Sequence, residues 1–583
     1  MKFRLLFALI FCCGVQLRAA DTNAVPVNYY ILTPPAPATP RINGANVFGV
    51  RPGSPFLFTI PATGERPMEF SIEGAPAGLI IVTNGIEPQW ITQGFGVLKL
   101  EPVNGQMPWT TEPVGVLKLN PINGQLTGWI AAKAEYKIVL CAKNSQGVAK
   151  KDFRIVCGDQ FALTPPMGWN SWNCFAHAVS ADRVKAAADA MVKSGLINHG
   201  WTYINVDDFW QNHRGPKGSP KWQAEQANDT TLHGEYRDAK GFIVPNSRFP
   251  DMKGLADYIH SLGLKAGLYS SPGPWTCGGC VGSWEHEQQD AETYAKWGYD
   301  YLKYDWCSYD DVAMGKLPND KNIPRFNQWD RKATNYAGAI WPFQLMGNAL
   351  REQKRDIVYS LCQYGMGKVW LWGASVNGQC WRTTGDIVDC WAAPDKKTSD
   401  SVTSIGFNQD DYAPYAKPGN WNDPDMLVVG EVGWGNLHPT RLTPDEQYSH
   451  ISLWCLLAAP LLIGCDMEKF DDFTLNLLSN DDVLAIDQDE LGKQATCVLK
   501  DGNVRVYAKE LADGGRAFGI FNLGSATANW ELKALTQFGL IGKQHVRDLW
   551  RQKDLADLDA AKGILPLTIP AHGVVFYKLT AAK

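Results

Sequence analysis

Tyr301-Leu-Lys-Tyr-Asp-Trp-Cys307 is the stretch on which the interpretation of the fold depends. It places a lysine and an aspartate two residues apart in a segment that otherwise has the composition of a buried strand. Side chains two apart on a strand point to the same side. Lys303 and Asp305 are therefore expected to face one space together. They are either a structural ion pair or part of a functional site at the end of a strand.

Seven further segments after Pro165 have the same strand pattern and alternate with amphipathic stretches. The eight strand candidates begin near Met167, Tyr203, Lys265, Tyr301, Ile357, Cys380, Gly419 and Ala459. Helical periodicity occurs between them, as in the stretches from Ala181 to Lys193, Met252 to Leu262, Glu285 to Trp297 and Pro444 to Leu457. Eight alternations predict a central (β/α)8 TIM barrel with insertions over residues 159–493.

Charged residues gather at the predicted C-terminal ends of four strands. Besides the first stretch, these ends read Asn205-Val-Asp-Asp-Phe-Trp210, Cys380-Trp-Arg-Thr-Thr-Gly-Asp386 and Asn420-Trp-Asn-Asp-Pro-Asp-Met426. One acidic strand end can be a helix cap or an ion pair at the bottom of the barrel. Four ends that would share one rim predict a functional site, because barrel sites lie there.

The kinds of residue on this rim narrow the chemistry. The chain has ten histidines without ligand spacing and no His-Glu-x-x-His, which argues against a zinc hydrolase. Asp207, Asp208, Asp305 and Asp386 could hold magnesium or calcium, but Lys303 and Arg382 on the same rim would oppose a divalent cation. We therefore expect no metal and no cofactor. Carboxylates interleaved with Lys, Arg and Trp suit a sugar, since its hydroxyls need donors and acceptors and its apolar face needs a ring.

Two carboxylates across a glycosidic bond are enough to hydrolyse it. Asp305 lies beside Lys303, whose charge is expected to keep the carboxylate ionised, as a nucleophile requires. Asp386 follows Arg382 by four residues and would have to carry a proton to act as the acid.

Six linked motifs resemble the α-galactosidases (melibiases) of glycoside hydrolase family 27, in the right order over about 159 to 495. They are Met167-Gly-Trp-Asn-Ser-Trp172, Asp207-Asp208 with Trp210, Gly267-Leu-Tyr269, Lys303-Tyr-Asp305 with Cys307, Arg382 with Asp386, and Trp421-Asn-Asp-Pro-Asp-Met-Leu427. The segment Asp487-Gln-Asp-Glu-Leu-Gly492 also resembles the family where the chain leaves the barrel.

The resemblance implies a role for each matching position. Asp305 matches the nucleophile and Asp386 the acid/base. Asp207 and Asp208 match the carboxylates on the galactose O6 and axial O4. The other implied substrate-binding residues are the ring-hydroxyl donors Lys303 and Arg382, the pocket walls Trp169, Tyr269 and Met426, and Asp425 in the last motif. Cys277 and Cys307 match a disulfide of the family.

The chain departs from the family pattern after strand five. Family galactosidases usually read Cys-Glu-Trp there, whereas this chain reads Leu361-Cys-Gln-Tyr-Gly365. Gln363 keeps the hydrogen-bonding shape of Glu but loses its charge, so contacts near the 2-position of the sugar can differ. We expect a retaining exo-enzyme that removes terminal α-D-galactose from an oligosaccharide or polysaccharide. The alternatives are an α-N-acetylgalactosaminidase, a β-L-arabinopyranosidase and a catalytically silent sugar-binding protein.

The N-terminal end is expected to direct export. Lys2 and Arg4 precede an apolar run from Leu5 to Val15, so residues 1–20 are predicted to be a signal peptide of a periplasmic or extracellular protein. The run is too short to span a bilayer. A net charge of -5 gives no basic patch for nucleic acid.

Two β-rich regions are predicted to flank the barrel. Residues 21–158 hold short apolar segments, an 11-residue motif that occurs from Gly96 to Gln106 and again from Gly115 to Gln125, and a hairpin around Asn144-Ser-Gln-Gly147. The hairpin resembles the end of the immunoglobulin-like modules that precede bacterial glycosidases, which implies an N-terminal immunoglobulin-like β-sandwich. Residues 494–583 return to β pattern, with Asp513-Gly514 as a turn, and resemble the antiparallel β-sandwich that follows the family's barrel.

Overall fold

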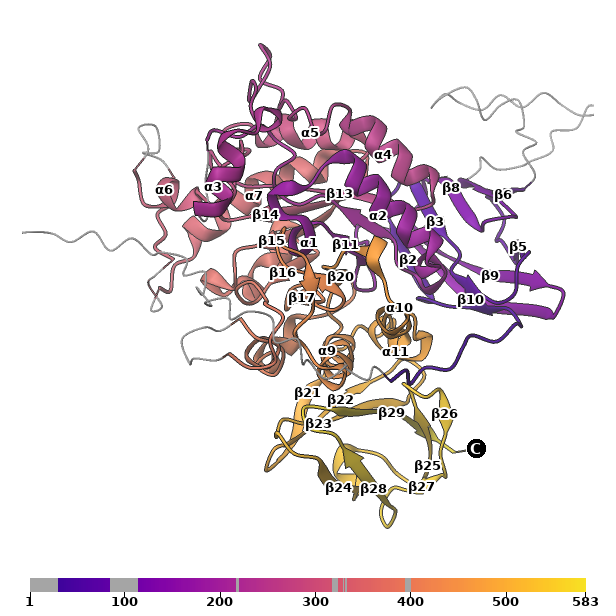
Figure 1. Cartoon of the computed structure of the whole chain (residues 1–583). Helices are drawn as coiled ribbons and strands as arrows, with labels where there is room; N and C mark the ends of the chain where they lie inside the picture. Colours follow the sequence, from indigo (N-terminus) through magenta and orange to yellow (C-terminus); the bar gives the residue numbers. More distant parts are fainter. Residues whose placement is uncertain are drawn as a thin grey trace, which may run out of the picture.

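Three consecutive bodies make up the protein in the computed structural model, which describes residues 30–83, 114–215, 220–316, 323–328, 330, 333–393 and 400–582. A β-rich N-terminal body, a central α/β body and a C-terminal β body follow one another along the chain (Figure 1). The expected signal peptide at residues 1–20 and the first copy of the repeated motif, from Gly96 to Gln106, lie outside the described residues.

Eight parallel strands form the central sheet, in the order β17-β16-β15-β14-β13-β12-β11-β20. They are β11 (Met167–Asn170), β12 (Tyr203–Asn205), β13 (Lys265–Ser270), β14 (Tyr301–Asp305), β15 (Val358–Cys362), β16 (Cys380–Arg382), β17 (Trp421–Asp423) and β20 (Leu461–Ile463). Leu427, just beyond β17, closes the ring: its N–H donates to the carbonyl of Leu462 at 2.8 Å, and its carbonyl accepts from the N–H of Gly464 at 3.1 Å. The predicted barrel is confirmed, and five of the eight expected strand starts coincide with observed ones.

Helices surround this sheet, with the longer ones packed against its outer face (Figure 1). They are α1 (Trp172–Phe175), α2 (Ala181–Lys193), α3 (Pro220–Ala227), α4 (Met252–Ser261), α5 (Glu287–Trp297), α6 (Tyr309–Ala313), α7 (Ala337–Glu352), α8 (Val402–Gly406), α9 (Pro444–Leu456), α10 (Asp472–Leu478) and α11 (Asp481–Asp487). Thr443 begins α9 with a capping box to Glu446, and Asp251 caps α4 by accepting from the N–H of Gly254 at 2.8 Å. Within the described residues, no helix combines the length and the apolar character that crossing a bilayer requires.

Burial on both faces explains the apolar composition of the barrel strands. The N-terminal end of the barrel is plugged by a separate apolar cluster, which contains Phe161, Tyr203, Tyr301, Val358, Cys380, Trp421 and Ala458.

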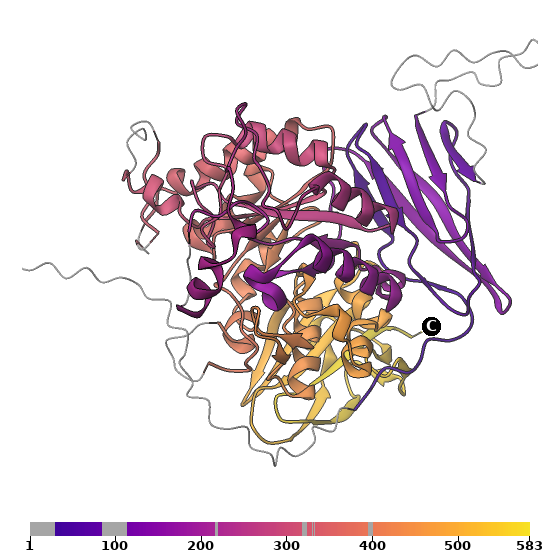
Figure 2. The same cartoon turned by 45° about the horizontal axis from the view of Figure 1, so that its top comes forward.

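Two four-stranded sheets form the N-terminal body, in the orders β2-β10-β9-β5 and β3-β8-β7-β6, and a two-stranded pair β1-β4 lies beside them. The strands are β1 (Arg41–Ile42), β2 (Val47–Val50), β3 (Phe56–Thr59), β4 (Ala62–Thr63), β5 (Glu69–Glu73), β6 (Leu79–Thr83), β7 (Gly115–Leu119), β8 (Gln125–Ile130), β9 (Ala134–Asn144) and β10 (Gly147–Cys157). The expected hairpin is confirmed, since β9 and β10 pair antiparallel around Asn144 and Gly147. Both sheets contribute to one core, and Figure 2 shows their strands beside the barrel.

The C-terminal body is an antiparallel β-sandwich. A larger sheet runs β21-β22-β23-β29-β25-β26, with β27 also paired to β25, and β24 pairs with β28 in a second sheet. The strands are β21 (Thr496–Asp501), β22 (Val504–Glu510), β23 (Arg516–Asn522), β24 (Ala528–Lys533), β25 (Lys543–Asp548), β26 (Lys553–Asp554), β27 (Leu558–Asp559), β28 (Ile564–Ile569) and β29 (Val574–Ala581). Side chains from both sheets share a single apolar core.

Arg51, directly after β2, joins the N-terminal body to the plugged end of the barrel. Its Nε donates to Asp356 Oδ1 at 2.6 Å and its backbone N–H donates to Asp356 Oδ2 at 2.9 Å. Its Nη1 donates to the carbonyl of Arg351 at 2.8 Å and its Nη2 to that of Gln353 at 3.1 Å. The guanidinium therefore donates hydrogen bonds to the carbonyl and carboxylate oxygens of the loop between α7 and β15, which the N-terminal body covers.

Replacing Arg51 with Met should destabilise the protein strongly, because the covered carboxylate of Asp356 loses its cation. Removing one partner of a buried pair usually costs about 3 kcal/mol or more. Thermal unfolding of the full chain measures the change. Lys133→Met is the matched control, since its pair with Asp159 has side chains 60% and 64% exposed. Exposed pairs contribute about 0 to 1 kcal/mol. Equal melting temperatures for the two variants would contradict the role given to Arg51.

Candidate active site

The site residues expected from the sequence all lie at or just beyond the C-terminal ends of barrel strands. Five of them lie on strands: Trp169 on β11, Tyr269 on β13, Lys303 and Asp305 on β14, and Arg382 on β16. The others come after a strand: Asp207 and Asp208 after β12, Gln363 after β15, Asp386 after β16, and Asp425 and Met426 after β17. Parallel strands bring these ends to one rim. The structure thus gathers residues that are far apart in the sequence around one space.

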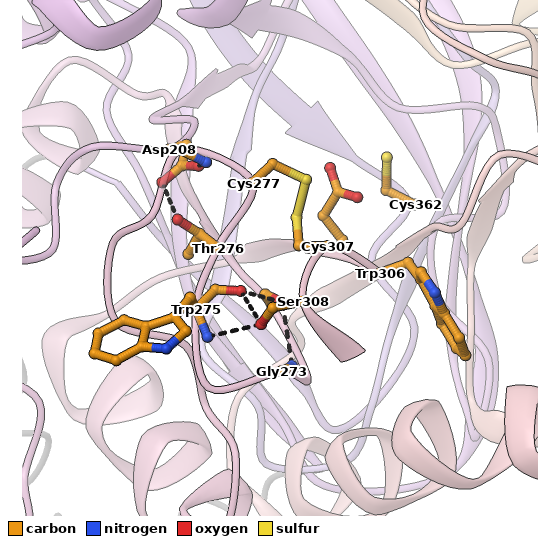
Figure 3. The surroundings of a disulfide bond; sticks show 12 residues. Asp208, Gly273, Trp275, Thr276, Cys277, Trp306, Cys307, Ser308 and Cys362 are labelled. Atoms are coloured by element: carbon orange, nitrogen blue, oxygen red, sulfur yellow. Dashed lines mark hydrogen bonds between the residues drawn. A yellow bond between two sulfur atoms is a disulfide. The ribbon is translucent and has the colours of Figure 1, made fainter. Parts of the chain in front are cut away.

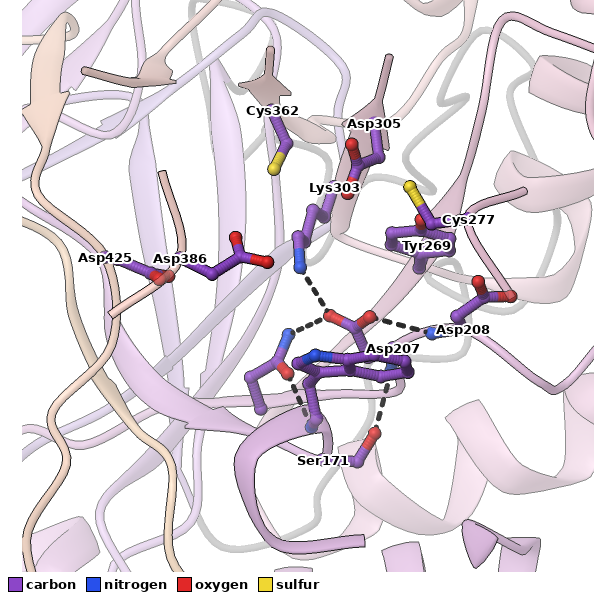
Figure 4. Close-up of polar contacts among 12 residues, drawn as sticks. Ser171, Asp207, Asp208, Tyr269, Cys277, Lys303, Asp305, Cys362, Asp386 and Asp425 are labelled. Atoms are coloured by element: carbon purple, nitrogen blue, oxygen red, sulfur yellow. Dashed lines mark hydrogen bonds and ion pairs between the residues drawn. The ribbon is translucent and has the colours of Figure 1, made fainter. Parts of the chain in front are cut away.

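Lys303 and Asp207 form a buried ion pair at the centre of this rim. Lys303 Nζ donates to Asp207 Oδ2 at 2.8 Å, and the side chains are 12% and 2% exposed. Asn170 Nδ2 donates to the same oxygen at 2.9 Å, and the N–H of Asp208 donates to Oδ1 at 2.9 Å (Figure 4). Three donors therefore hold the Asp207 carboxylate in one orientation.

Asp208 is held by a different set of donors, most of them from the loop after β13. Its Oδ1 accepts from the N–H of Phe209 and from Thr276 Oγ1, both at 2.8 Å, and its Oδ2 accepts from the N–H of Gly278 at 2.7 Å. A Cβ on Gly278 would lie 2.8 Å from that oxygen, so the close approach requires glycine. Burial nevertheless raises the pKa of the Asp208 carboxyl.

Asp305 is buried, with 5% of its surface exposed. Its Oδ1 accepts a hydrogen bond from the hydroxyl of Tyr364 at 2.5 Å. Burial raises the pKa of its carboxyl to about 7, although the charge of Lys303 and the hydrogen bond of Tyr364 act in the opposite direction. We expected Lys303 to keep Asp305 ionised, but the ammonium donates to Asp207, and burial is the larger effect.

Arg382 connects two further carboxylates on the far side of Lys303. Its Nη2 donates to Asp386 Oδ1 at 3.0 Å, and its Nη1 forms an ion pair with Asp425 Oδ1 at 3.0 Å. The guanidinium is 3% exposed, whereas the Asp386 side chain is 44% exposed. Burial raises the pKa of Asp425 to about 6, and Arg382 acts against this rise. Asp386 is thus the carboxylate of this group that is open to solvent.

Cys277 and Cys307 are joined by a disulfide, with their Cα atoms 4.7 Å apart (Figure 3). The bond ties the loop that holds Asp208 to the strand end that carries Asp305. The hydroxyl of Tyr269 lies 3.2 Å from Cys307 Sγ. The two sulfurs and a carboxylate oxygen of Asp305 lie within 4.8 Å of one another. Because the sulfurs are bonded to each other, they do not offer thiolates to a metal.

The remaining expected residues lie at or just beyond the ends of the same strands. Trp169 is fully buried and its Nε1 donates to the carbonyl of Cys465 at 2.8 Å. Lys303 Nζ lies 5.3 Å from the centre of the Tyr269 ring. Met426 is 3% exposed. Gln363 is fully buried, and among the described residues neither end of its amide has a hydrogen-bond partner. An unpaired buried amide is costly, so this position is not optimised for stability.

Backbone strain coincides with the rim. Phe209, Cys307, Tyr364 and Asp425 follow four different barrel strands and have φ angles of 79°, 38°, 59° and 83°. Positive φ in residues other than glycine costs about 1 to 3 kcal/mol each and persists where the surrounding structure enforces it. Such strain is typical of functional sites.

Sequence reasoning missed four residues of the site. Asn170, Thr276, Gly278 and Tyr364 all hydrogen-bond to one of its carboxylates. Signals for them existed, since Asn170 and Tyr364 stand in stretches already singled out, and Thr276 and Gly278 flank Cys277. Their partners depend on the paths of loops, which no local pattern specifies.

Comparisons with known proteins agree with this geometry. Residues 225–489 match the family described as "Alpha galactosidase A", and residues 501–579 match the "Alpha galactosidase C-terminal beta sandwich domain". Alpha-galactosidase 2 of Arabidopsis thaliana is 38% identical over 437 residues, which are 74% of this chain and 93% of the relative.

Solved structures extend the similarity to 93% of the chain. A Bacteroides fragilis protein provisionally assigned as an α-galactosidase/melibiase has a TM-score of 0.73 and 32% identity, covering 93% of this chain and 98% of that one. An α-galactosidase from Saccharomyces cerevisiae, solved with raffinose, has a TM-score of 0.60 and 26% identity, covering 72% and 98%.

Replacing Asp305 with Asn tests its raised pKa without measuring activity. The folded pKa is about 7, whereas an unfolded aspartate titrates near about 3.9. Because the pKa rises on folding, the carboxyl is neutral in both states below about pH 3.9, and its full destabilising effect is present above about pH 7. The uncharged variant should therefore gain stability over the wild type as pH rises, by about 2.6 kcal/mol between pH 5 and pH 8.

Melting temperatures of both proteins at the two pH values check this expectation. Asp257→Asn, on the surface of α4 with a side chain 57% exposed, reports the effect of losing one surface charge. A difference between Asp305→Asn and the wild type that does not change with pH would contradict the raised pKa.

Proposed function

The chain belongs to the α-galactosidase (melibiase) family, glycoside hydrolase family 27, and we propose that it removes terminal non-reducing α-D-galactosyl residues with retention of configuration. The substrates are α-galactoside oligosaccharides or polysaccharides; raffinose, present in the yeast relative's structure, is one example. The reaction needs only the side chains of the rim.

The observation that carries this proposal is a pair of carboxylates in opposite environments. Asp305 is buried and Asp386 is open to solvent, and both face the space around the Lys303 ammonium (Figure 4). A nucleophile benefits from being shielded from water, whereas an acid/base must exchange protons with water and with the leaving group. We assign Asp305 as the nucleophile and Asp386 as the acid/base.

The reaction then proceeds in two displacements. Asp305 attacks C1 of the galactosyl unit while Asp386 gives its proton to the leaving oxygen. Asp386, now a carboxylate, takes a proton from water, whose oxygen bonds to C1 as the bond to Asp305 breaks. Two inversions at C1 give net retention. Arg382 positions Asp386 throughout, and Lys303 offsets part of the negative charge at the rim.

Asp207 and Asp208 are suited to recognising the hydroxyl groups of the sugar. A carboxylate offers about four lone-pair positions. Three donors of the protein already occupy each of these two carboxylates. One acceptor position remains on each, and we propose that these accept from O6 and from the axial O4 of galactose. In glucose, O4 is equatorial and would leave one position unpaired.

The 2-position is where the chain departs from the family. The buried amide of Gln363 has both a donor and an acceptor free among the described residues, so it can pair with a 2-hydroxyl in either direction. An acetamido group would need room as well as a donor. Because Gln363 contacts the 2-position in this proposal, α-N-acetylgalactosaminidase activity is the alternative specificity. An arabinopyranoside lacks C6, so the carboxylate proposed to accept from O6 would lose that hydrogen bond.

We also propose an assignment of the flanking regions. Residues 21–158 form an immunoglobulin-like sandwich, which the two four-stranded sheets with a shared core support. The catalytic barrel spans 159–493 and the antiparallel sandwich 494–583. The apolar run near the N-terminus supports export to the periplasm or the extracellular space.

Product stereochemistry tests the two carboxylates. Proton NMR of the first product should show the α-anomer of galactose, and the β-anomer would overturn Asp305 as nucleophile. Asp305→Asn should lose activity entirely. Asp386→Asn should retain the first step with substrates whose leaving groups need no proton, such as a dinitrophenyl α-galactoside. A wild type that binds galactose but turns over no chromogenic galactoside would instead be a silent sugar-binding protein.

A panel of p-nitrophenyl glycosides tests the sugar. Losing a hydrogen bond to a charged group costs about 1.5 to 3 kcal/mol, so kcat/KM should be at least about tenfold lower for the α-glucoside than for the α-galactoside. The arabinopyranoside should lose a similar factor through the missing O6. A higher kcat/KM for the 2-acetamido substrate would replace the proposed specificity by that of an α-N-acetylgalactosaminidase.

A further inference from the structure

Tyr364 donates the one hydrogen bond that the described residues give to the Asp305 carboxylate. The distance from its hydroxyl to Oδ1 is 2.5 Å. Within the described part of the chain, Oδ2 of Asp305 receives no hydrogen bond. The resemblance to the family places Trp at this position, so a phenol hydroxyl here is a feature of this chain's own sequence.

The backbone around Tyr364 holds the phenol in place. Tyr364 has a φ of 59°, and Gly365 follows with a φ of 79°. The N–H of Gly365 donates to the carbonyl of Arg382 at 3.0 Å, and a Cβ there would lie 2.3 Å from the carbonyl of Thr383. The turn after β15 is thus fixed against β16, and its strained geometry directs the side chain back over β14.

Contacts around the ring restrict it further. The guanidinium of Arg382 lies 5.9 Å from the ring centre, and Cys277 Sγ lies 3.5 Å from the hydroxyl. Burial raises the pKa of the phenol well above its ordinary value, so it remains a donor throughout the working range.

We propose that Tyr364 is a positioning residue that holds Oδ1 of Asp305, so that Oδ2 faces the sugar carbon, and that it assists the departure of Asp305 from the galactosyl-enzyme. The inference deepens the proposed function and rests on the assignment of Asp305 as nucleophile. It adds a residue that orients Asp305 and that affects the rate mainly in the second displacement.

Charge movement during the reaction decides which step depends on the hydroxyl. In the first displacement the carboxylate loses charge as Oδ2 bonds to C1, so a donor on Oδ1 helps orientation more than rate. In the second, Asp386 takes a proton from water, the water oxygen bonds to C1, and the electron pair of the C1–Oδ2 bond returns to Asp305. A hydrogen bond to Oδ1 strengthens as this charge develops, because bonds to ionised acceptors are the stronger ones.

The hydroxyl also affects when Asp305 is ionised. The titratable groups that face this carboxyl are Lys303, Tyr364, Cys362, Tyr269, Asp207 and Asp386. Burial raises its pKa to about 7, and Lys303 and Tyr364 are the groups that oppose this rise. Without the hydroxyl, the carboxylate loses a donor to its charged form, and its pKa should rise further.

Tyr364→Phe in the full chain tests the proposal, with Tyr304→Phe as the matched control. Tyr304 precedes Asp305, and its buried hydroxyl has no hydrogen-bond partner among the described residues. With a dinitrophenyl α-galactoside at the pH plateau, Tyr364→Phe should lower kcat at least about tenfold and lower KM with it, since a charge-assisted hydrogen bond is worth about 1.5 to 3 kcal/mol. The value of kcat/KM should change little there.

Two further measurements separate positioning from loss of structure. The acid limb of kcat/KM should move to higher pH by about one unit or more. Intact-mass spectra of enzyme quenched during turnover should show a larger galactosyl-bound fraction than in the wild type. Tyr304→Phe should match the wild type in both.

The proposal is overturned if kcat and kcat/KM fall together with no shift of the acid limb and no trapped galactosyl-enzyme, or if Tyr364→Phe behaves like the control. The two levels of inference remain distinguishable. If Asp305→Asn is inactive while Tyr364→Phe is unaffected, only the role of Tyr364 fails. If Asp305→Asn is active, the proposed function fails.

Discussion

The ion pair between Lys303 and Asp207 is the interaction on which the site depends. A closed parallel sheet brings Asp207, Asp208, Asp305, Asp386 and Asp425 to one rim, where Lys303 and Arg382 supply the positive charge. Arg382 is bound to Asp386 and Asp425, and the hydrogen bond from Lys303 goes to Asp207. Asp305 therefore receives only the through-space field of Lys303, and its burial outweighs that field. Because the ion pair fixes Asp207, Asp305 keeps a pKa raised to about 7 and is ionised mainly above that pH.

Loops after the strands hold these charged side chains in fixed positions. Asp208 takes two of its hydrogen bonds from Thr276 and Gly278, the neighbours of Cys277, and the disulfide ties that loop to the end of β14. The segments that hold Asp208 and Asp305 are thus linked by the disulfide as well as through the sheet. Positive φ angles after four strands indicate that the rim stores strain, which the packed barrel below it enforces. Tight positioning is the property that displacement at a single carbon requires.

The sequence predicted the barrel well, because hydrophobic periodicity and strand ends are local signals. The strands near Met167, Tyr203 and Tyr301 begin where expected, and the end of each strand identified the rim. Partner choice is not local. Lys303 could pair with Asp305 on its own strand, yet it reaches Asp207 at the end of β12, from which β14 is separated by β13. Alternate strands of a closed barrel direct side chains into the same layer, which a local pattern does not reveal. Tyr364 reaches Asp305 only through a turn with positive φ. The parallel pairing of β2 with β10 likewise depends on contacts far apart in sequence.

The N-terminal end of the barrel contributes mainly to stability, whereas the C-terminal end carries polar groups that lower it. At the N-terminal end, an apolar plug fills the barrel and Arg51 satisfies Asp356 with hydrogen bonds from both its backbone and its side chain. At the C-terminal end, the Gln363 amide and Arg382 Nε are buried without partners in the described structure. Each unpaired group lowers stability by about 1 to 3 kcal/mol, and packing alone would favour apolar replacements. Their position around Asp305 and Asp386 is explained if hydroxyl groups of a bound sugar form hydrogen bonds with them. Groups that lower the stability of the free protein would then contribute to binding of the sugar.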